Sequence, residues 1–403
     1  MSTLGRRRLN GWKGSRRWRL LSAFLPFTIL FFGGLAAPCA PPVPQDTAAT
    51  RAISAAEFSR LIRELSEKEG YFFSDNFISN ESSYLHVVDK LKQLGVSGGA
   101  YVGVGPEQNF TYIAKIRPEI AFIVDIRRQA IIQHLLYKAI FHLANDRAHF
   151  LSLLFSKPLR GAQAPTRNAS LDRLLEYFSQ TPASREAFEQ NLAKIQNKIQ
   201  RDFEVPLTPD DLETLGYLYG AFAYASLDIS FRLGRRYSPW GWWSLFPTLK
   251  DLMLAEDLNG KKGNFLAREE DYDFVRRLHR LNRIIPIVGD FAGSKALAAI
   301  ADYLRENHYT VSAYYTSNVE EYLFDAEVFE RYTKNVRRLP ITHKSVFIRS
   351  VRVAWVPHPM QVPGHRMIML LQNIAVFLKD SDQGRYPNYR RLITTHPIAP
   401  QEP

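Results

Sequence analysis

The chain has 403 residues, of which 46% are hydrophobic, so it can bury a large core in one big domain or two modest ones. Its formal net charge is +12, but residues 1–40 carry seven basic side chains and no acid, which leaves +5 on residues 41–403. That mild excess argues against nucleic acid as a partner. The single cysteine, Cys39, excludes a disulfide framework or a thiolate metal site in the folded part.

Residues 1–40 have the pattern of an export signal. Seven basic residues precede the uncharged run at 20–37, and a proline-rich stretch with small residues follows it. The run is also nearly long enough for a membrane anchor, although Pro26 weakens a stable helix. We therefore expect a signal peptide or membrane anchor, with the rest of the protein periplasmic or held on the outer face of the inner membrane. Acylation of Cys39 is a further alternative.

Residues 41–52 are predicted to link this segment to a single domain at 53–403. Helices are predicted to begin near Ser54 and near Ser82. The strand GAYVGVG, a short helix from about Gln108 and the apolar strand IAFIVDI follow. Apolar strands with helices between them predict a parallel sheet that is covered on both faces.

A long helix is predicted over about residues 127–155, and residues 156–280 are predicted to be a helical insertion. Strands are then expected at IIPIVGD, TVSAYYTSN and KSVFIRSV, with helices between them, while MIMLLQNIAVFL fits either helix or strand. The expected fold is therefore α/β, a Rossmann-type and mostly parallel sheet with helices on both faces and a helical insertion.

The turn after the first predicted strand is typical of a nucleotide-binding corner. Gly103 and Gly105 would let the backbone approach a ligand, and the helix from Gln108 would offer free N–H groups. Asp125 ends the next strand, where an acid can bind ribose hydroxyls. The alternative is a plain strand-to-helix corner without a ligand, because this glycine pattern alone is weak evidence.

Several stretches resemble known families. GAYVGVGPEQNF followed by IAFIVDI resembles the first two motifs of class I S-adenosylmethionine-dependent methyltransferases. Together with SNESSYL, IPIVGDFAGSKAL and SNVEEYL, it resembles an uncharacterised bacterial family assigned a methyltransferase-like fold, over about residues 66–335. The resemblance implies S-adenosylmethionine as the cofactor. Two positions differ from the usual first motif, since Tyr101 replaces an acid and Glu107 replaces a third glycine.

The resemblance also implies where the cofactor would lie. The implied contacts are at strand ends and at one helix start: Gly103, Gly105, Glu107, Gln108, Asn109, Asp125 and Asp290. The glycines and Glu107 would line the methionine part, Asp125 would hold the ribose, and Asp290 would face the adenine.

Catalytic groups are implied after the fourth strand. Asn318, Glu320 or Tyr315 would orient the methyl acceptor, and positioning would supply most of the rate.

The stretch FISNESSYLHVV precedes the first strand and would lie over the ligand cleft. We expect Asn80 and Glu81 to contribute to the site. The alternative is that Asn80 caps a helix, with Ser83 at its third position.

Three other patterns carry weaker signals. VGDFAGSK does not have the spacing of a phosphate-binding Walker loop and favours a simple turn. His134, Lys138 and His142 share one predicted helix with Asp146, and a solvated helix face is favoured over a metal site. The tryptophan-rich loop at 237–246 is equally compatible with a lid, a partner contact, a membrane-surface contact or the insertion's own core.

The sequence therefore leads to two main hypotheses. The first is an S-adenosylmethionine-dependent methyltransferase-like protein of unknown acceptor, exported or membrane-anchored. The second is a non-catalytic extracytoplasmic protein that keeps the fold to bind a nucleotide-like ligand or a partner; its support is the export signal, because the cofactor is made in the cytoplasm. An exported hydrolase is a third, weaker reading.

Overall fold

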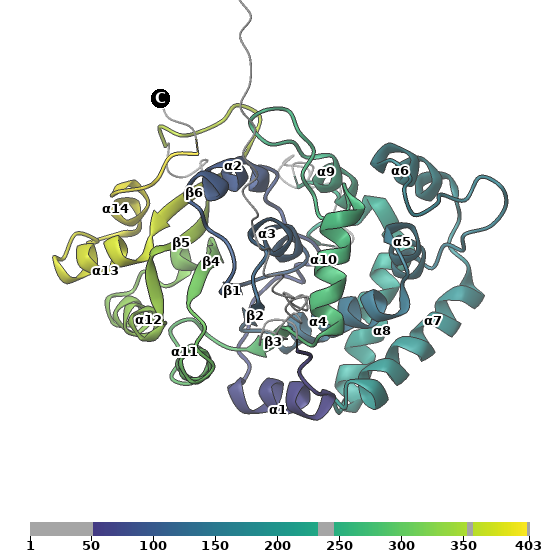
Figure 1. The fold of residues 1–403 in the computed structure, drawn as a ribbon, viewed down its shortest axis with the longest axis horizontal. Helices are drawn as coiled ribbons and strands as arrows, with labels where there is room; N and C mark the ends of the chain where they lie inside the picture. Colours follow the sequence, from purple (N-terminus) through teal and green to yellow (C-terminus); the bar gives the residue numbers. More distant parts are fainter. Residues whose placement is uncertain (1–50, 233–245, 353–357, 401–403) are drawn as a thin grey trace, which may run out of the picture. The chain divides into compact units, whose positions relative to one another are not determined.

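The computed structural model describes residues 51–232, 246–352 and 358–400, which belong to one compact unit, Asp46–Pro403. A six-stranded sheet forms its centre, in the order β3-β2-β1-β4-β5-β6 (Figure 1). The strands are β1 (Ala100–Gly103), β2 (Ile120–Asp125), β3 (Ile284–Val288), β4 (Val311–Ser317), β5 (Ile341–Arg352) and β6 (Met367–Asn373). Strands β1 to β5 are parallel and β6 is antiparallel to β5, so the predicted α/β class and mostly parallel sheet are confirmed.

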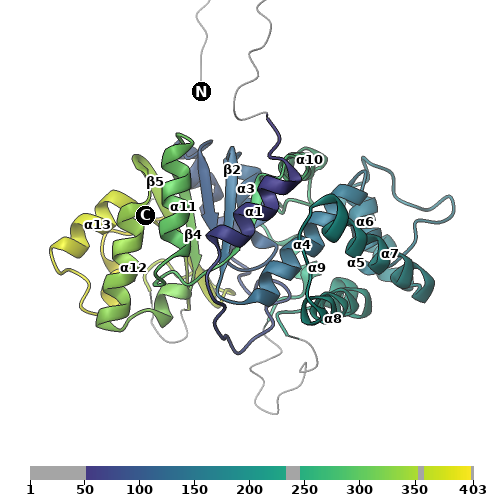
Figure 2. The same cartoon turned by 90° about the horizontal axis from the view of Figure 1, so that it is seen from below.

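The central strands are buried along their whole length, which explains their apolar sequences. Every residue of β1, β2 and β3 is buried, as expected for strands covered on both faces. Helices α3 (Gln108–Ile116) and α10 (Glu269–Arg280) lie on one face, while α11 (Ala296–Glu306) and α12 (Ala326–Arg338) lie on the other (Figures 1 and 2). Helix α1 (Ala55–Leu65) packs against β3, and Ser54 caps its first turn.

The segment between β2 and β3 is helical. Its helices are α4 (Arg128–Leu143), α5 (Arg147–Phe155), α6 (Leu171–Gln180), α7 (Arg185–Asn197), η3 (Lys198–Asp202), α8 (Pro209–Ala225), η4 (Ser226–Asp228), α9 (Leu249–Leu254) and α10. Helix α8 packs on α4, α5 and α7, so this segment extends the core beyond the sheet (Figure 1).

The single long helix expected over 127–155 is wrong. Helix α4 ends at Leu143, and α5 begins at Arg147. Asp146 separates them because its side chain accepts a hydrogen bond from the backbone N–H of His149 at 2.8 Å, which caps the start of a new helix.

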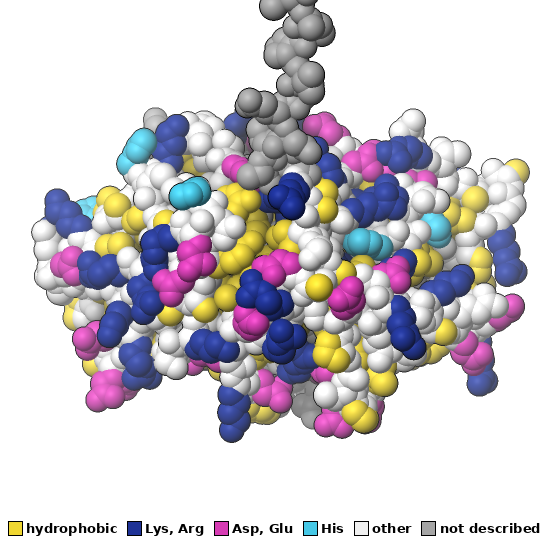
Figure 3. All heavy atoms as spheres, turned by 60° about the horizontal axis from the view of Figure 1, so that its bottom comes forward, with side chains coloured by type: hydrophobic (Ala, Val, Ile, Leu, Met, Phe, Trp, Pro, Cys, Tyr) yellow, Lys and Arg dark blue, Asp and Glu magenta, His cyan; other side chains and the backbone are white. Residues whose placement is uncertain are grey.

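The C-terminal apolar stretch contains both of the elements that its sequence allowed. Residues Met367–Asn373 form β6, and Ile374–Asp382 continue as α13, with Asn373 as the helix cap. The remaining elements are η2 (Tyr84–Val87), α2 (Val88–Gln93), η6 (Val319–Tyr322) and α14 (Tyr389–Thr394). On the face drawn in Figure 3, basic and acidic side chains are interspersed.

Candidate functional site

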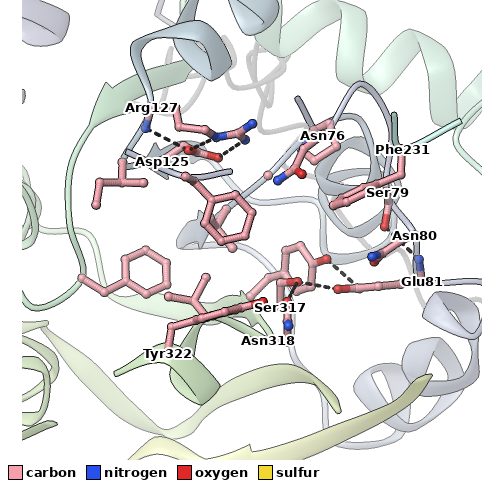
Figure 4. Close-up of a pocket in the computed structure, with 18 of the residues that line it drawn as sticks. Asn76, Ser79, Asn80, Glu81, Asp125, Arg127, Phe231, Ser317, Asn318 and Tyr322 are labelled. Carbon is pink, nitrogen blue, oxygen red and sulfur yellow. Dashed lines mark hydrogen bonds and ion pairs between the residues drawn. The ribbon is translucent and has the colours of Figure 1, made fainter. Parts of the chain in front are cut away.

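A cavity of about 550 Å³ lies at the carboxyl ends of the parallel strands. Strand order reverses between β1 and β4, and ligands of open α/β sheets bind at such a reversal. The cavity wall includes Gly105 after β1, Asp125 at the end of β2, Asp290 after β3 and Ser317 at the end of β4. The segment at 71–81, which precedes β1, supplies another part of the wall (Figure 4). The volume is in the range of small-molecule sites.

The glycine turn after β1 is built by close packing. A Cβ at Gly103 would lie 2.0 Å from Oδ1 of Asn109, so no side chain fits there. The Asn109 amide donates to the carbonyls of Val104 at 2.9 Å and Pro106 at 2.8 Å. Gly103 and Asn109 therefore shape the turn and do not line the cavity.

Gly105 is the glycine of this turn that faces the cavity. Its φ is +78°, a left-handed value that favours glycine, and an added Cβ would meet open space. Its carbonyl contacts Nε2 of His134 at 2.9 Å. The backbone of the turn is thus fixed from behind and open toward the cavity.

Glu107 and Gln108 lie behind the wall and do not line the cavity. Oε1 of Glu107 accepts from the Ser79 N–H at 3.3 Å, and within the described chain its Oε2 has no hydrogen-bond partner. Burial raises the pKa of Glu107 to about 8, with a smaller contribution from the charge of Glu81. Glu107 is therefore protonated in much of the neutral range.

Glu81 is a buried carboxyl group that reaches the cavity. It is 1% exposed and accepts hydrogen bonds from the Ser317 hydroxyl, from the Tyr315 hydroxyl at 2.7 Å and from Nε2 of Gln108 at 2.6 Å (Figure 4). Burial raises its pKa, and these hydrogen bonds oppose the rise. Tyr315 lines the cavity from the same strand as Ser317. The structure thus brings Glu81 and Tyr315 into one cluster, whereas the sequence analysis assigned them to different parts of the site.

Asp125 lines the cavity but already has a partner. Arg127 donates to both of its carboxylate oxygens, from Nε at 3.0 Å and from Nη2 at 2.9 Å (Figure 4). Nη1 of the same guanidinium donates to the carbonyls of Ser74 and Asp75. This buried pair therefore ties the end of β2 to the segment at 71–81.

Asp290 lines the cavity after β3, and its carboxylate accepts from the Ala292 N–H at 2.9 Å. In the same turn, the carboxylate of Glu67 accepts from the N–H groups of Asp290 at 2.7 Å and Lys295 at 3.1 Å. An internal acid thus occupies donors that a phosphate loop would leave for its ligand, in agreement with the simple turn favoured by the sequence.

The residues after β4 separate into two groups. Asn318 lines the cavity, as does Asn80, and their chain neighbours Ser317 and Glu81 are hydrogen-bonded to each other. Glu320 does not: it is 1% exposed and forms an ion pair with Arg349, while the Tyr332 hydroxyl donates to it at 2.9 Å. Asn80 does not cap the following helical turn, which begins after Ser83.

The sequence missed several parts of the wall. Aromatic side chains line it, notably Phe72 and Tyr322, whose rings meet edge to face at 5.6 Å. Arg352 and Arg366 also line it, from the end of β5 and from the residue just before β6. The adjacent aromatic residues of GYFFSDNF were the one available signal. Of the tryptophan-rich loop 237–246, Phe246 lines the cavity, and residues 237–245 lie outside the described chain.

The solvated helix face expected for His134 and Lys138 is wrong. Both side chains are buried, at 2% and 1% exposure. Lys138 donates to Oδ1 of Asn282 at 2.6 Å, and its pKa is lowered well below the usual value by burial. The helical insertion packs over this face, which a local pattern could not reveal. Among residues 51–232, 246–352 and 358–400 no cluster of three or more His, Cys, Asp or Glu side chains is arranged to hold a metal.

The fold and the cavity define an α/β protein with a cavity at the carboxyl edge of a mostly parallel sheet. The chain matches the sequence model of a family described as Domain of unknown function (DUF7790) over residues 76–211 and 226–402, and it belongs to that family. No curated protein matches the chain. Within the described ranges, no helix is both long enough and apolar enough to cross a membrane.

Proposed function

We propose that this protein is a Rossmann-type, S-adenosylmethionine-dependent methyltransferase-like protein. One observation carries the proposal: Gly105, Asp125 and Asp290, which follow three neighbouring strands, line one cavity at the reversal of strand order. Sheets of this kind bind nucleotides at that place, with an acid at the end of the second strand near the ribose. The choice of cofactor rests on the resemblance of residues 99–125 to methyltransferase motifs.

The cavity fits such a cofactor in size, and its side chains fit it in hydrogen-bonding chemistry. The cavity volume of about 550 Å³ suits a nucleoside-sized ligand, and Gly105 leaves open space beside the turn. Asp125 and Asp290 would accept hydrogen bonds from the nucleoside. The bound cofactor would supply an activated methyl group. The protein's own contribution is to align the acceptor with that group.

Glu81 would serve as the proton acceptor in this site. An acceptor nucleophile loses a proton when it is methylated, and a carboxyl group with a raised pKa suits proton transfer near neutral pH. Ser317 and Tyr315 hold the Glu81 carboxylate in place, and Asn318 lies on the same wall to orient the acceptor.

A second candidate function has a specific observation in its favour. Both oxygens of Asp125 are engaged by Arg127, so the acid expected to hold a ribose already has a strong partner. A non-catalytic extracytoplasmic protein that binds a different small ligand in this cavity would fit that pairing.

Calorimetric titration of the full-length protein with S-adenosylhomocysteine separates these functions. We expect saturable binding that Asp125→Asn weakens by roughly tenfold, since a hydrogen bond to a charged group is lost. The matched control is Asp302→Asn, in an exposed ion pair on α11, which should bind as the wild type does. Absence of heat and of any thermal shift at millimolar ligand would leave only the binding-protein alternative.

We also propose that the protein is exported or membrane-anchored. The support is the charge and hydropathy pattern of residues 1–40, which lie outside the described chain, as does most of the suggested membrane contact through 20–37 and 237–246. Cell fractionation tests this. A shortened periplasmic protein or a membrane-bound one is expected, and a full-length cytosolic protein would contradict export.

A further inference from the structure

Arg366 is a cation in the cavity wall that forms no ion pair with any described residue. Its side chain is half-buried, and its guanidinium carbon lies 5.1 Å from the centre of the Phe246 ring. No carboxylate pairs with it anywhere in the described ranges. The sequence contains no Asp or Glu at 233–245 or 353–357, the two stretches outside the described chain that directly precede Phe246 and follow Arg352. An arginine in a partly dry wall normally has an anionic or polar partner.

Arg352 adds a second cation to the same part of the wall. Met367, the neighbour of Arg366, pairs with Arg352 across β5 and β6, so the two arginines come from adjacent backbone positions. Arg352 donates from Nε and Nη2 to Glu321, at 3.0 and 2.7 Å, and its Nη1 makes no hydrogen bond within the described chain. Burial, and then the nearby charge of Arg352, lower the pKa of Arg366.

Asp125, Asp290 and Glu81, which line the cavity, form no ion pair with Arg366 or Arg352 in the described chain. Asp125 is paired with Arg127, Asp290 accepts from its own turn, and Glu81 accepts from Ser317, Tyr315 and Gln108. In the described part of the wall, the charge of Arg366 at the β5–β6 end is therefore not balanced by a paired carboxylate, whereas Arg352 is paired with Glu321.

We propose that Arg366 and Arg352 form an anion-binding subsite, which takes a carboxylate or phosphate group of the ligand. The planar guanidinium fork matches both groups, and the Phe246 ring holds the Arg366 plane in position. This proposal extends the proposed function, and it rests on that function for the identity of the molecule that carries the anion. That anion is either the carboxylate of the cofactor's methionine part or an anionic group on the methyl acceptor.

Calorimetry with inorganic pyrophosphate tests the subsite without any cofactor. In the full-length protein we expect Arg366→Gln to weaken pyrophosphate binding by roughly tenfold or more, since a charge-assisted contact is lost, and Arg366→Lys to restore part of it. The matched control is Arg185→Gln, at an exposed i,i+4 pair on α7, which should leave the affinity unchanged. A thermal melt checks that each variant is folded. Equal affinity in wild type and Arg366→Gln, or no pyrophosphate binding at all, would overturn the subsite.

A second pair of titrations identifies the source of the anion. S-adenosylhomocysteine carries a carboxylate, and methylthioadenosine lacks it. If Arg366→Gln weakens the binding of S-adenosylhomocysteine but not that of methylthioadenosine, the subsite holds the cofactor's carboxylate. If it weakens pyrophosphate binding but the binding of neither adenosine compound, the subsite holds an anionic group of the acceptor. A protein that binds pyrophosphate through Arg366 but neither adenosine compound would refute the methyltransferase proposal and leave the subsite standing. A protein that binds the adenosine compounds but does not bind pyrophosphate through Arg366 would refute the subsite and leave the methyltransferase proposal standing.

Discussion

Two buried glutamates, Glu81 and Glu320, show how differently one side chain can be used in this protein. Each is 1% exposed, and each accepts a hydrogen bond from a tyrosine hydroxyl. The donors to Glu81 are all neutral, and the carboxyl group reaches the cavity. Glu320 instead faces the guanidinium of Arg349, away from the cavity.

The difference separates a structural carboxylate from one suited to proton transfer. A carboxylate that is paired with a buried cation supports the fold, because it compensates a charge that water cannot reach. Among neutral donors, burial raises the pKa of the Glu81 carboxyl group, which favours its taking up a proton. The partner's charge, rather than the depth of burial, therefore distinguishes the two sites.

The largest expected effect follows from breaking the structural pair. Glu320→Gln leaves the Arg349 charge buried with only amide partners, including Oε1 of Gln372 at 2.7 Å. Loss of one member of a buried ion pair costs about 3–5 kcal/mol, so the free energy of unfolding in denaturant should fall by about that amount.

The control for this prediction is the neighbouring residue Glu321. Its pair with Arg352 is partly solvated, with side-chain exposures of 25% and 34%, so Glu321→Gln should cost at most about 1 kcal/mol. Equal losses for the two variants would show that the Glu320 pair contributes no more than an exposed one.

A pH effect is expected from Glu107, whose pKa is raised from 4.5 to about 8. The folded state keeps this proton over a range where the unfolded state has lost it. The stabilising contribution is thus full below about pH 4.5 and is lost as pH rises toward 8, by up to about 1.4 kcal/mol per unit. Glu107→Gln should flatten the decline measured by unfolding at several pH values. An unchanged slope in the variant would assign the decline to other groups.

A smaller effect is expected from Ser317→Ala. The variant removes one hydroxyl donor from Glu81, at a cost of about 1 kcal/mol. Because that donor lowers the pKa of Glu81, its loss should raise the pKa further. Unfolding curves give the cost, and carboxyl titration by NMR gives the pKa. A lowered pKa would mean that Ser317 does not donate to Glu81.

Much of the fold followed from local sequence patterns, because buried parallel strands are apolar throughout. The runs that end at Gly103 and Asp125 could be read in this way. The break before Asp146 was missed, since the short polar stretch Asn145–Arg147 lies between two apolar helical segments and fits one exposed turn of a longer helix as well as a helix cap. The burial of Lys138 was missed because helices distant in sequence cover it.

Apart from Asn80 and Glu81, which were placed by the segment before the first strand, the site was predictable mainly where a residue lies at a strand end. Asp125, Asp290 and Asn318 could be placed at the cavity because parallel strands deliver their carboxyl ends to one edge. Glu320 could not be excluded from it, since its partner Arg349 is 29 residues away in the chain. Arg366 was missed for the same reason, because the pairing of β5 with β6 brings it to the wall.

The smallest expected change in stability, and the sharpest test of the comparison, is Glu81→Gln. The amide keeps the shape of the side chain. Its oxygen can still accept from Tyr315 and Gln108, and its NH2 group can donate to the Ser317 hydroxyl, which rotates to accept, so stability at pH 5 should change by less than about 1 kcal/mol. The wild-type carboxyl has a raised pKa in the folded state, so its contribution is present at low pH and declines as pH rises. The variant lacks this carboxyl group and its decline. Its free energy of unfolding, relative to that of the wild type, should therefore increase with pH when both are measured between pH 5 and pH 9. Glu320→Gln should lose stability throughout that range. If Glu81→Gln instead shows the same uniform loss, Glu81 is a second structural carboxylate, and the proton-acceptor role proposed for it fails.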